Sequence, residues 1–219
     1  EYVDTTLIPF AMFTAKDTVL PIRVRIIGDV ADHDRYFTIR VVDTLTTAKV
    51  GEDYEPFENS QVVEAGERQT EIPCRIVWTE KLMQNPDTVI YLTVRLEESA
   101  DFKLPLKRWI PFGSIYGSKD KVVNPIVHVI GINDQVVVPK QWTVNYWGAF
   151  SPTKFKLVCE VLGLSMQDFE DNKVMTSNRA KALAQNFDRY LKEEKAAGRT
   201  VMDKDAAGNE FEMTMGPLI

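Results

Sequence analysis

Hydrophobic and polar residues alternate along most of the first 139 residues. In the stretch from Leu20 to Ile27, Ile22 and Val24 fall on one face while Arg23 falls on the other. The same alternation recurs in four further stretches, at residues 36–42, 70–78, 88–96 and 125–132. A period of two is typical of a strand with one face buried and the other in water. Each stretch therefore predicts a β-strand.

Turn-forming residues separate the predicted strands. They are Gly28-Asp29, Gly51-Glu52-Asp53, Ala65-Gly66-Glu67 and Asn85-Pro86-Asp87. No helical pattern lies between the strands, and several short strands spaced by turns are typical of an antiparallel sandwich. We therefore expect an immunoglobulin-like β-sandwich over residues 1–139.

The period changes after Pro139, and residues 140–219 predict a small helical domain. Ser151 followed by Pro152 is a strong helix start, and Gly163 is a natural stop. A second, short helix is expected to begin after Ser165, with Asp168 completing a capping-box pair, and a third helix is expected near Ser177. Residues 200–214 read as a short terminal hairpin that turns at residues 207–209. The whole chain is therefore expected to be an α+β protein.

Four aromatic residues precede the first predicted helix. They are Trp142, Tyr146, Trp147 and Phe150. Because a helix with one apolar stripe must bury that stripe, we expect these rings to dock the helices against the sandwich. The alternative is an exposed surface that grips a ligand.

Charge excludes two classes of partner. The 219 residues carry a net charge of −6, and the pI is about 5.1. An acidic chain without a basic stripe repels the phosphate backbone, so nucleic acid is not an expected partner. It also lacks the basic helix that would bind a membrane surface, and no apolar run is long enough to span one.

The sequence predicts no metal site and no cofactor. The two histidines, His33 and His128, show no ligand spacing with the two cysteines, Cys74 and Cys159. The two cysteines either pair as a disulfide or remain as separate buried thiols. Acidic residues are scattered over the loops without forming a 12-residue calcium loop. We therefore interpret these acidic residues as solvated loop charges, and a bound calcium ion is the alternative.

Motifs for catalysis are missing from the sequence. It has no Gly-x-Ser-x-Gly elbow, no His-Glu-x-x-His helix and no phosphate-binding glycine loop. We therefore expect a protein that is not an enzyme. A glycosidase pair of carboxylates, which needs roughly 5–10 Å of separation in a cleft, is the alternative.

One stretch has the composition of a binding loop. Residues 105–121 join two predicted strands and are too long for a tight turn, as functional loops often are. Trp109, Phe112 and Tyr116 are the candidate ligand-binding residues, because flat aromatic faces can stack on sugar rings. The alternative is that Trp109 and Phe112 fold inward as a lid over the end of the sandwich.

The segment from Gly51 to Trp78 resembles the Calx-β type of immunoglobulin-like repeat. The matching residues are Gly51, Asp53, Tyr54, Ala65, Gly66 and Glu67. The resemblance covers about three strands and implies a fold more than a function. Some repeats of that type bind calcium through acidic loops.

Most of the chain resembles the domain-of-unknown-function 4843 family. The matching residues are Pro21, Val24, Gly28, Ala31, Asp32, Asp34, Arg35, Phe37, Trp142, Tyr146, Gly148, Ser151 and Lys154. The resemblance implies an exported lipoprotein of Gram-negative gut anaerobes, at the outer membrane surface or in the periplasm. The lipid anchor would lie outside this chain, and the implied partner is a polysaccharide or an outer-membrane glycan-import complex. No catalytic residue can be carried over.

Three functions follow as hypotheses. The first is a non-catalytic envelope protein that assists glycan capture or uptake. The second is a protein–protein interaction module of the cell envelope with no small ligand. The third is a glycoside hydrolase with an unrecognised pair of carboxylates.

Overall fold

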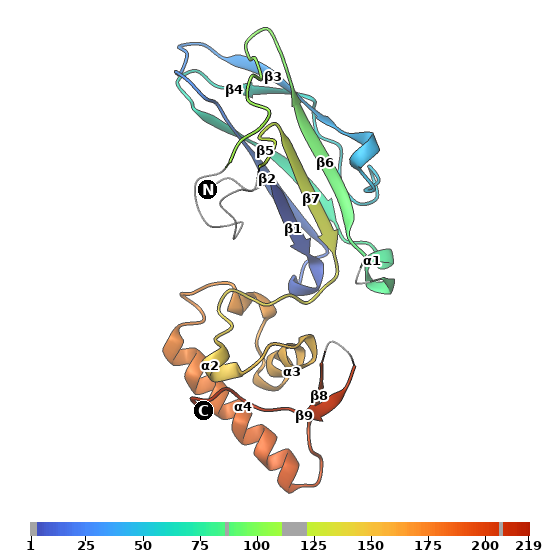
Figure 1. Ribbon diagram of the computed structural model, residues 1–219, viewed down its shortest axis with the longest axis vertical. Coiled ribbons are helices and arrows are strands. Elements are labelled where there is room, and N and C mark those ends of the chain that lie inside the picture. The colour runs from blue at the N-terminus through green and yellow to red at the C-terminus, as the bar shows by residue number, and fades with distance from the viewer. Residues whose placement is uncertain (1–3, 86–87, 111–121, 206–207) are drawn as a thin grey trace. The chain divides into compact units, whose positions relative to one another are not determined.

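The alternating stretches form β-strands in the computed structural model, which describes residues 4–85, 88–110, 122–205 and 208–219 (Figure 1). The chain divides into two compact units. The first comprises residues 1–10 and 15–135, and the second comprises residues 11–14 and 136–219. The sequence predicts a boundary after residue 139, and the compact units divide after residue 135.

Two β-sheets build the first unit. The larger has five strands in the order β1–β7–β6–β3–β4, and the smaller pairs β2 with β5. Their bounds are β1 Thr5–Pro9, β2 Asp17–Arg25, β3 Arg35–Val41, β4 Ser60–Val63, β5 Gln69–Val77, β6 Ile90–Glu97 and β7 Val127–Asn133. Two short helices of the described residues accompany them, η2 Asp43–Leu45 and α1 Glu80–Gln84. A third, η1 Phe10–Met12, begins in the first unit and ends in the second.

The strand pairs of both sheets are antiparallel except for β1 and β7, which run parallel with Leu7 opposite Gly131. Strands β3 and β5 bury alternate residues, as the sequence pattern predicts, while β6 and β7 also bury consecutive residues. On β5, Ile72, Cys74 and Ile76 are at most 1% exposed, while the residues between them are exposed. The expected fold class, an antiparallel immunoglobulin-like sandwich followed by a helical part, is confirmed.

Helices and a hairpin build the second unit. Their bounds are α2 Val144–Trp147, α3 Pro152–Leu162, η4 Met166–Phe169, α4 Ser177–Ala196, β8 Met202–Lys204 and β9 Glu210–Glu212. The predicted caps are present: the Ser151 hydroxyl accepts a hydrogen bond from the Lys154 amide, and Ser165 forms a capping box with Asp168. Gly163 ends α3 in the left-handed conformation, at φ 63°.

The aromatic cluster expected at the junction is the core of the second unit. Trp142 stacks on Trp147 at 5.6 Å between ring centroids, and both rings contact Phe169. Phe155 of α3 lies edge-on to Trp142 and Phe169, at 5.6 and 5.0 Å. Trp147, Phe155 and Phe169 are fully buried. The described ring contacts of this cluster therefore lie inside the helical unit, which they hold together.

The end of the chain closes this core. Gly216 donates a hydrogen bond from its amide to the Tyr146 carbonyl, at 2.9 Å, and Leu218 donates to Asn145 at 3.0 Å. A β-carbon on Gly216 would lie 2.4 Å from the carbonyl oxygens of Val144 and Asn145. Only glycine fits this close approach between the C-terminal segment and α2.

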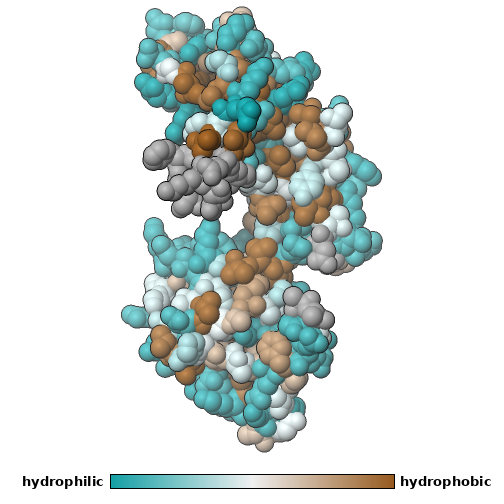
Figure 2. Space-filling view, in the orientation of Figure 1, coloured by the Kyte–Doolittle hydropathy of each residue, from teal (hydrophilic) through white to brown (hydrophobic). Residues whose placement is uncertain are grey.

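Hydrophobic residues also reach the surface. Figure 2 shows them in patches among hydrophilic residues on its visible face. Leu7, Ile27 and Leu45 are 58%, 84% and 61% exposed. Within the described residues, no helix has both the length and the apolar character needed to cross a membrane.

Candidate functional site

Trp109 is the only one of the three candidate binding residues that the structure describes, because Phe112 and Tyr116 lie outside the described residues. It forms an isolated β-bridge with Val123. The Trp109 amide donates to the Val123 carbonyl at 2.9 Å, and the Val123 amide donates back at 2.8 Å. These two hydrogen bonds fix the backbone of Trp109 beside that of Val123, which is 4% exposed.

The Trp109 residue is 36% exposed. It is therefore neither buried as a lid nor fully in solvent. Its neighbours Ile110 and Val122 are 51% and 45% exposed, and Lys107 and Arg108 are exposed as well. A partly exposed indole on a fixed backbone can present its face to the apolar C–H surface of a sugar ring or to another flat partner.

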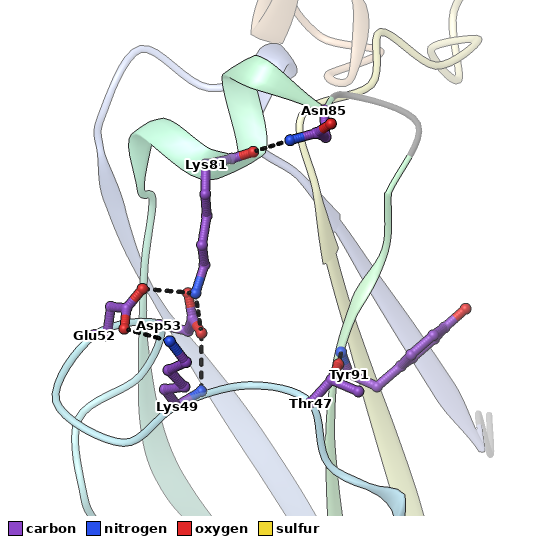
Figure 3. Close-up of polar contacts among 7 residues, drawn as sticks. All are labelled: Thr47, Lys49, Glu52, Asp53, Lys81, Asn85 and Tyr91. Carbon is purple, nitrogen blue, oxygen red and sulfur yellow. Dashed lines mark hydrogen bonds and ion pairs between the residues drawn. The ribbon is translucent and has the colours of Figure 1, made fainter.

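A second group of polar residues surrounds Asp53 (Figure 3). The Asp53 residue is 1% exposed, and its carboxylate accepts a hydrogen bond from the Lys49 amide at 2.8 Å. The Lys81 ammonium of α1 lies 2.7 Å from both oxygens of that carboxylate, and 2.8 Å from the Glu52 carboxylate. Burial lowers the pKa of Lys81, but hydrogen bonds to Asp53 and Glu52 outweigh this effect and raise it overall.

The arrangement around Asp53 is structural. The Asp53 amide and carbonyl also bond, to the Lys49 carbonyl and the Val77 amide, so this residue ties the turn before Tyr54 to strand β5. The neighbouring Lys81 ammonium already supplies the positive charge that a metal ion would bring to this carboxylate. The Gly-x-Asp-Tyr segment of the sequence thus anchors a corner of the sandwich.

A third polar group lies buried in the second unit. The Ser151 hydroxyl donates to the Asp203 carboxylate at 2.6 Å, and Asp203 is 1% exposed. The Lys154 ammonium, in a residue only 2% exposed, donates to the carbonyls of Ala149 and Trp147, at 2.9 and 3.3 Å. Burial lowers the pKa of Lys154, and the charge of Asp203 opposes that effect. These contacts fasten β8 and the segment before α3 to the helix.

The two histidines lie in different settings. His33 Nδ1 is 3.0 Å from the Asp32 carboxylate in an exposed loop. His128 of β7 is half-buried, with Nε2 3.1 Å from the Thr6 hydroxyl of β1. Among the residues that the structure describes, no group of three or more His, Cys, Asp or Glu side chains could hold a metal ion.

The two cysteines are free thiols, and both are buried. Burial raises the pKa of Cys74 to about 12 and, with a smaller contribution from the charge of Asp168, that of Cys159 to about 11. Of the two arrangements that the sequence left open, the structure has the separate buried thiols.

Neither thiol is expected to react while the protein is folded. A pKa of about 12 leaves roughly one part in 10⁴ of Cys74 as thiolate at pH 8, and the thiolate is the reactive form. Treatment with iodoacetamide at pH 8, followed by mass spectrometry, should show less than about a tenth of the labelling rate of a free thiol. Both residues should react fully in denaturant. Rapid labelling of the folded protein would contradict the buried positions.

The chain is similar to one protein family and to several distant solved structures. The chain matches the family described as Domain of unknown function (DUF4843) over residues 1–164. No curated protein matches it.

Three of the similar solved structures each match only part of the chain. The calcium binding domain CBD12 of CALX1.1 matches at 13% identity and a TM-score of 0.39, over 59% of this chain and 40% of its own. A Bacteroides ovatus protein provisionally assigned as carbohydrate binding matches at 7% identity and a TM-score of 0.38, over 62% and 36%. A Bacteroides ovatus protein of unknown function matches at 11% identity and a TM-score of 0.34, over 53% and 36%. The match thus spans two fifths or less of each of these proteins.

Proposed function

The chain belongs to the DUF4843 family of unknown function, and from that premise we propose that it is a non-catalytic, exported protein of the cell envelope that binds carbohydrate. It would be held at the outer membrane by a lipid anchor outside these 219 residues, and it would assist the capture or uptake of glycans. The binding surface would centre on Trp109.

The observation that carries this proposal is the position of Trp109. A tryptophan that leaves 36% of its area in solvent while its backbone is fixed by two hydrogen bonds to Val123 is suited to hold a flat ligand. Ile110 and Val122 extend the apolar surface beside it, and Lys107 and Arg108 add hydrogen-bond donors. Carbohydrate sites combine such an aromatic face with polar groups that bond to hydroxyls.

Replacing Trp109 with alanine should weaken binding without unfolding the protein. We expect the loss of a central aromatic contact to cost about 2 kcal/mol of binding free energy, or roughly thirtyfold in Kd. The free energy of unfolding should fall by only about 1 kcal/mol, because the backbone bridge remains. Affinity electrophoresis gives the change in retention on the polysaccharide, and urea denaturation gives the change in stability.

Tyr36→Ala is the matched control. Tyr36 is an exposed aromatic residue of the same unit, 55% exposed on β3. Its replacement should leave retention unchanged. If Trp109→Ala and Tyr36→Ala have the same effect on retention, Trp109 is not the binding residue. A loss of stability by several kcal/mol in Trp109→Ala would show instead that its ring belongs to the core.

A further inference from the structure

Two loops of the first unit are fastened together by hydrogen bonds. One connects β2 to β3 and the other connects β4 to β5. The Gly66 amide donates to the Ala31 carbonyl at 2.8 Å, and the Ala65 amide donates to the Asp34 carboxylate at 2.9 Å. The Arg68 guanidinium donates to the Gly28 carbonyl at 3.1 Å. The loops therefore hold a defined shape before any ligand arrives.

Two adjoining hollows lie beside these loops. The arginine hollow has a volume of about 650 Å³ and is lined by Arg25, Ile26, Gly66, Glu67, Arg68 and Gln69. The acidic hollow has a volume of about 300 Å³ and is lined by Val62, Glu64, Glu67, Gln69, Thr70 and Glu71. Glu67 and Gln69 line both hollows, so the two are neighbours. Their sizes fall in the range of ligand-binding sites.

The two arginines of the arginine hollow keep unused donors. Arg25 donates to the Gln69 side-chain oxygen at 3.3 Å, and Arg68 donates to a carbonyl. In the part of the chain that the structure describes, neither forms an ion pair with a carboxylate. Other arginines of this unit do: Arg23 lies 2.6 Å from Glu71, and Arg40 lies 2.7 Å from Glu97. Glu67 also lines this hollow, but no ion pair joins it to either arginine among the described residues. Two guanidinium groups that are not paired with a carboxylate are suited to an anion, which they can bind through paired hydrogen bonds.

The acidic hollow restricts which anion fits. Glu64 and Glu67 place negative charge next to the arginines, and the third carboxylate, that of Glu71, is paired with Arg23. A densely charged ligand such as a polyphosphate would be repelled there. The same carboxylates accept hydrogen bonds well, and so does the Gln69 side chain. Neutral hydroxyl groups are the partners that suit this half.

We propose that the two hollows together bind an oligosaccharide that carries a single uronic-acid residue. Its carboxylate lies between Arg25 and Arg68, and its neutral neighbouring sugar donates hydroxyl hydrogens to the glutamates of the acidic hollow. Gln69, at the junction, contacts both sugars. This site is separate from Trp109 and does not depend on the function proposed for that residue.

Calorimetric titration of the chain at low salt with two matched trisaccharides tests the proposal. One is aldotriouronic acid, which has one glucuronate and two xyloses, and the other is neutral xylotriose. The acidic sugar should bind at least tenfold more tightly. Trigalacturonate, with three carboxylates, should bind more weakly than aldotriouronic acid. Equal affinity for aldotriouronic acid and xylotriose, no heat with either, or tighter binding of trigalacturonate would overturn the proposal.

Variants locate the binding. Arg25→Gln combined with Arg68→Gln should abolish the preference for the acidic sugar. Arg25→Gln alone leaves the hydrogen bond between Arg68 and Gly28 intact, and it should reduce that preference at least threefold. This single variant still tests the proposal if the double variant does not fold. Arg95→Gln removes an arginine from the same unit that lines neither hollow, and it should bind as the wild type does. Unchanged preference in the Arg25 and Arg68 variants would place the binding elsewhere.

Trp109→Ala separates this site from the function proposed above. In this variant aldotriouronic acid should still bind at least tenfold more tightly than xylotriose. If Trp109→Ala removes that preference, the uronate binds near Trp109 and not in the hollows.

Discussion

Replacing Phe155 with alanine should destabilise the helical unit by about 3–5 kcal/mol, which is the usual cost of removing a buried phenylalanine. Phe155 is fully buried, and its ring lies within 6 Å of the rings of Trp142, Phe150 and Phe169. Truncation would leave a cavity at the centre of this aromatic cluster, which could collapse only in part. Urea denaturation followed by tryptophan fluorescence measures the loss, because Trp142 and Trp147 remain as probes in the same core.

Phe211 offers a matched control within the same unit. It lies on β9 and is 43% exposed. Phe211→Ala makes the same chemical change without opening a buried cavity, so we expect it to alter the free energy of unfolding by less than about 1 kcal/mol. Similar losses for the two variants would contradict the account of the second unit as a core built around these rings.

Replacing Asp53 with asparagine should destabilise the sandwich by about 2–3 kcal/mol. The carboxylate is buried and accepts hydrogen bonds from the Lys49 amide and the Lys81 ammonium. Asparagine keeps the shape but removes the charge, so that Lys81 loses its closest partner. The loss of stability can be measured by urea denaturation with circular dichroism.

Glu52→Gln separates burial from charge at this corner. Glu52 contacts the same Lys81 ammonium at 2.8 Å, but its side chain is 44% exposed. An exposed ion pair contributes little to stability, so Glu52→Gln should lower the free energy of unfolding by less than about 1 kcal/mol. If Glu52→Gln proves as costly as Asp53→Asn, the stability does not come from the buried hydrogen bonds of Asp53.

Much of the sandwich could be predicted from the sequence because hydrophobic residues recur at every second position in most of its strands. β2, β3, β5, β6 and β7 each coincide with a stretch of period two. Strand β1 was not predicted, because Thr5–Pro9 is short and its hydrophobic and polar residues do not clearly alternate. Its parallel pairing with β7 joins residues more than 120 positions apart, and a local pattern carries no information on such a contact.

In the helical unit too, features that depend on neighbouring residues were predicted, and contacts between distant residues were not. Caps at Ser151 and Ser165 depend on residues three positions away, and both predictions are confirmed. The burial of Lys154 was not predicted, because a lysine on an amphipathic helix is normally placed in water. It is buried because the carbonyls of Trp147 and Ala149 accept its hydrogen bonds. The bond between Ser151 and Asp203 crosses 52 residues and has no signal in the sequence.

The candidate binding surface could be predicted only in part. The composition of residues 105–121 singled out Trp109, which the structure finds partly exposed. No sequence pattern indicated the arginine hollow, because Arg25 and Arg68 lie 43 positions apart and are brought together only by the pairing of β2 with β5. Turn residues such as Gly28 and Gly66 indicated the loops but not what lies beside them.

The measurement that tests the central claim most directly is affinity electrophoresis of the purified chain against plant, host and microbial polysaccharides. We expect clear retardation by at least one class of polysaccharide, and loss of that retardation in Trp109→Ala but not in Tyr36→Ala. No retardation by any polysaccharide would contradict carbohydrate binding. Cross-linking in cells that make the protein would then be the way to look for a protein partner.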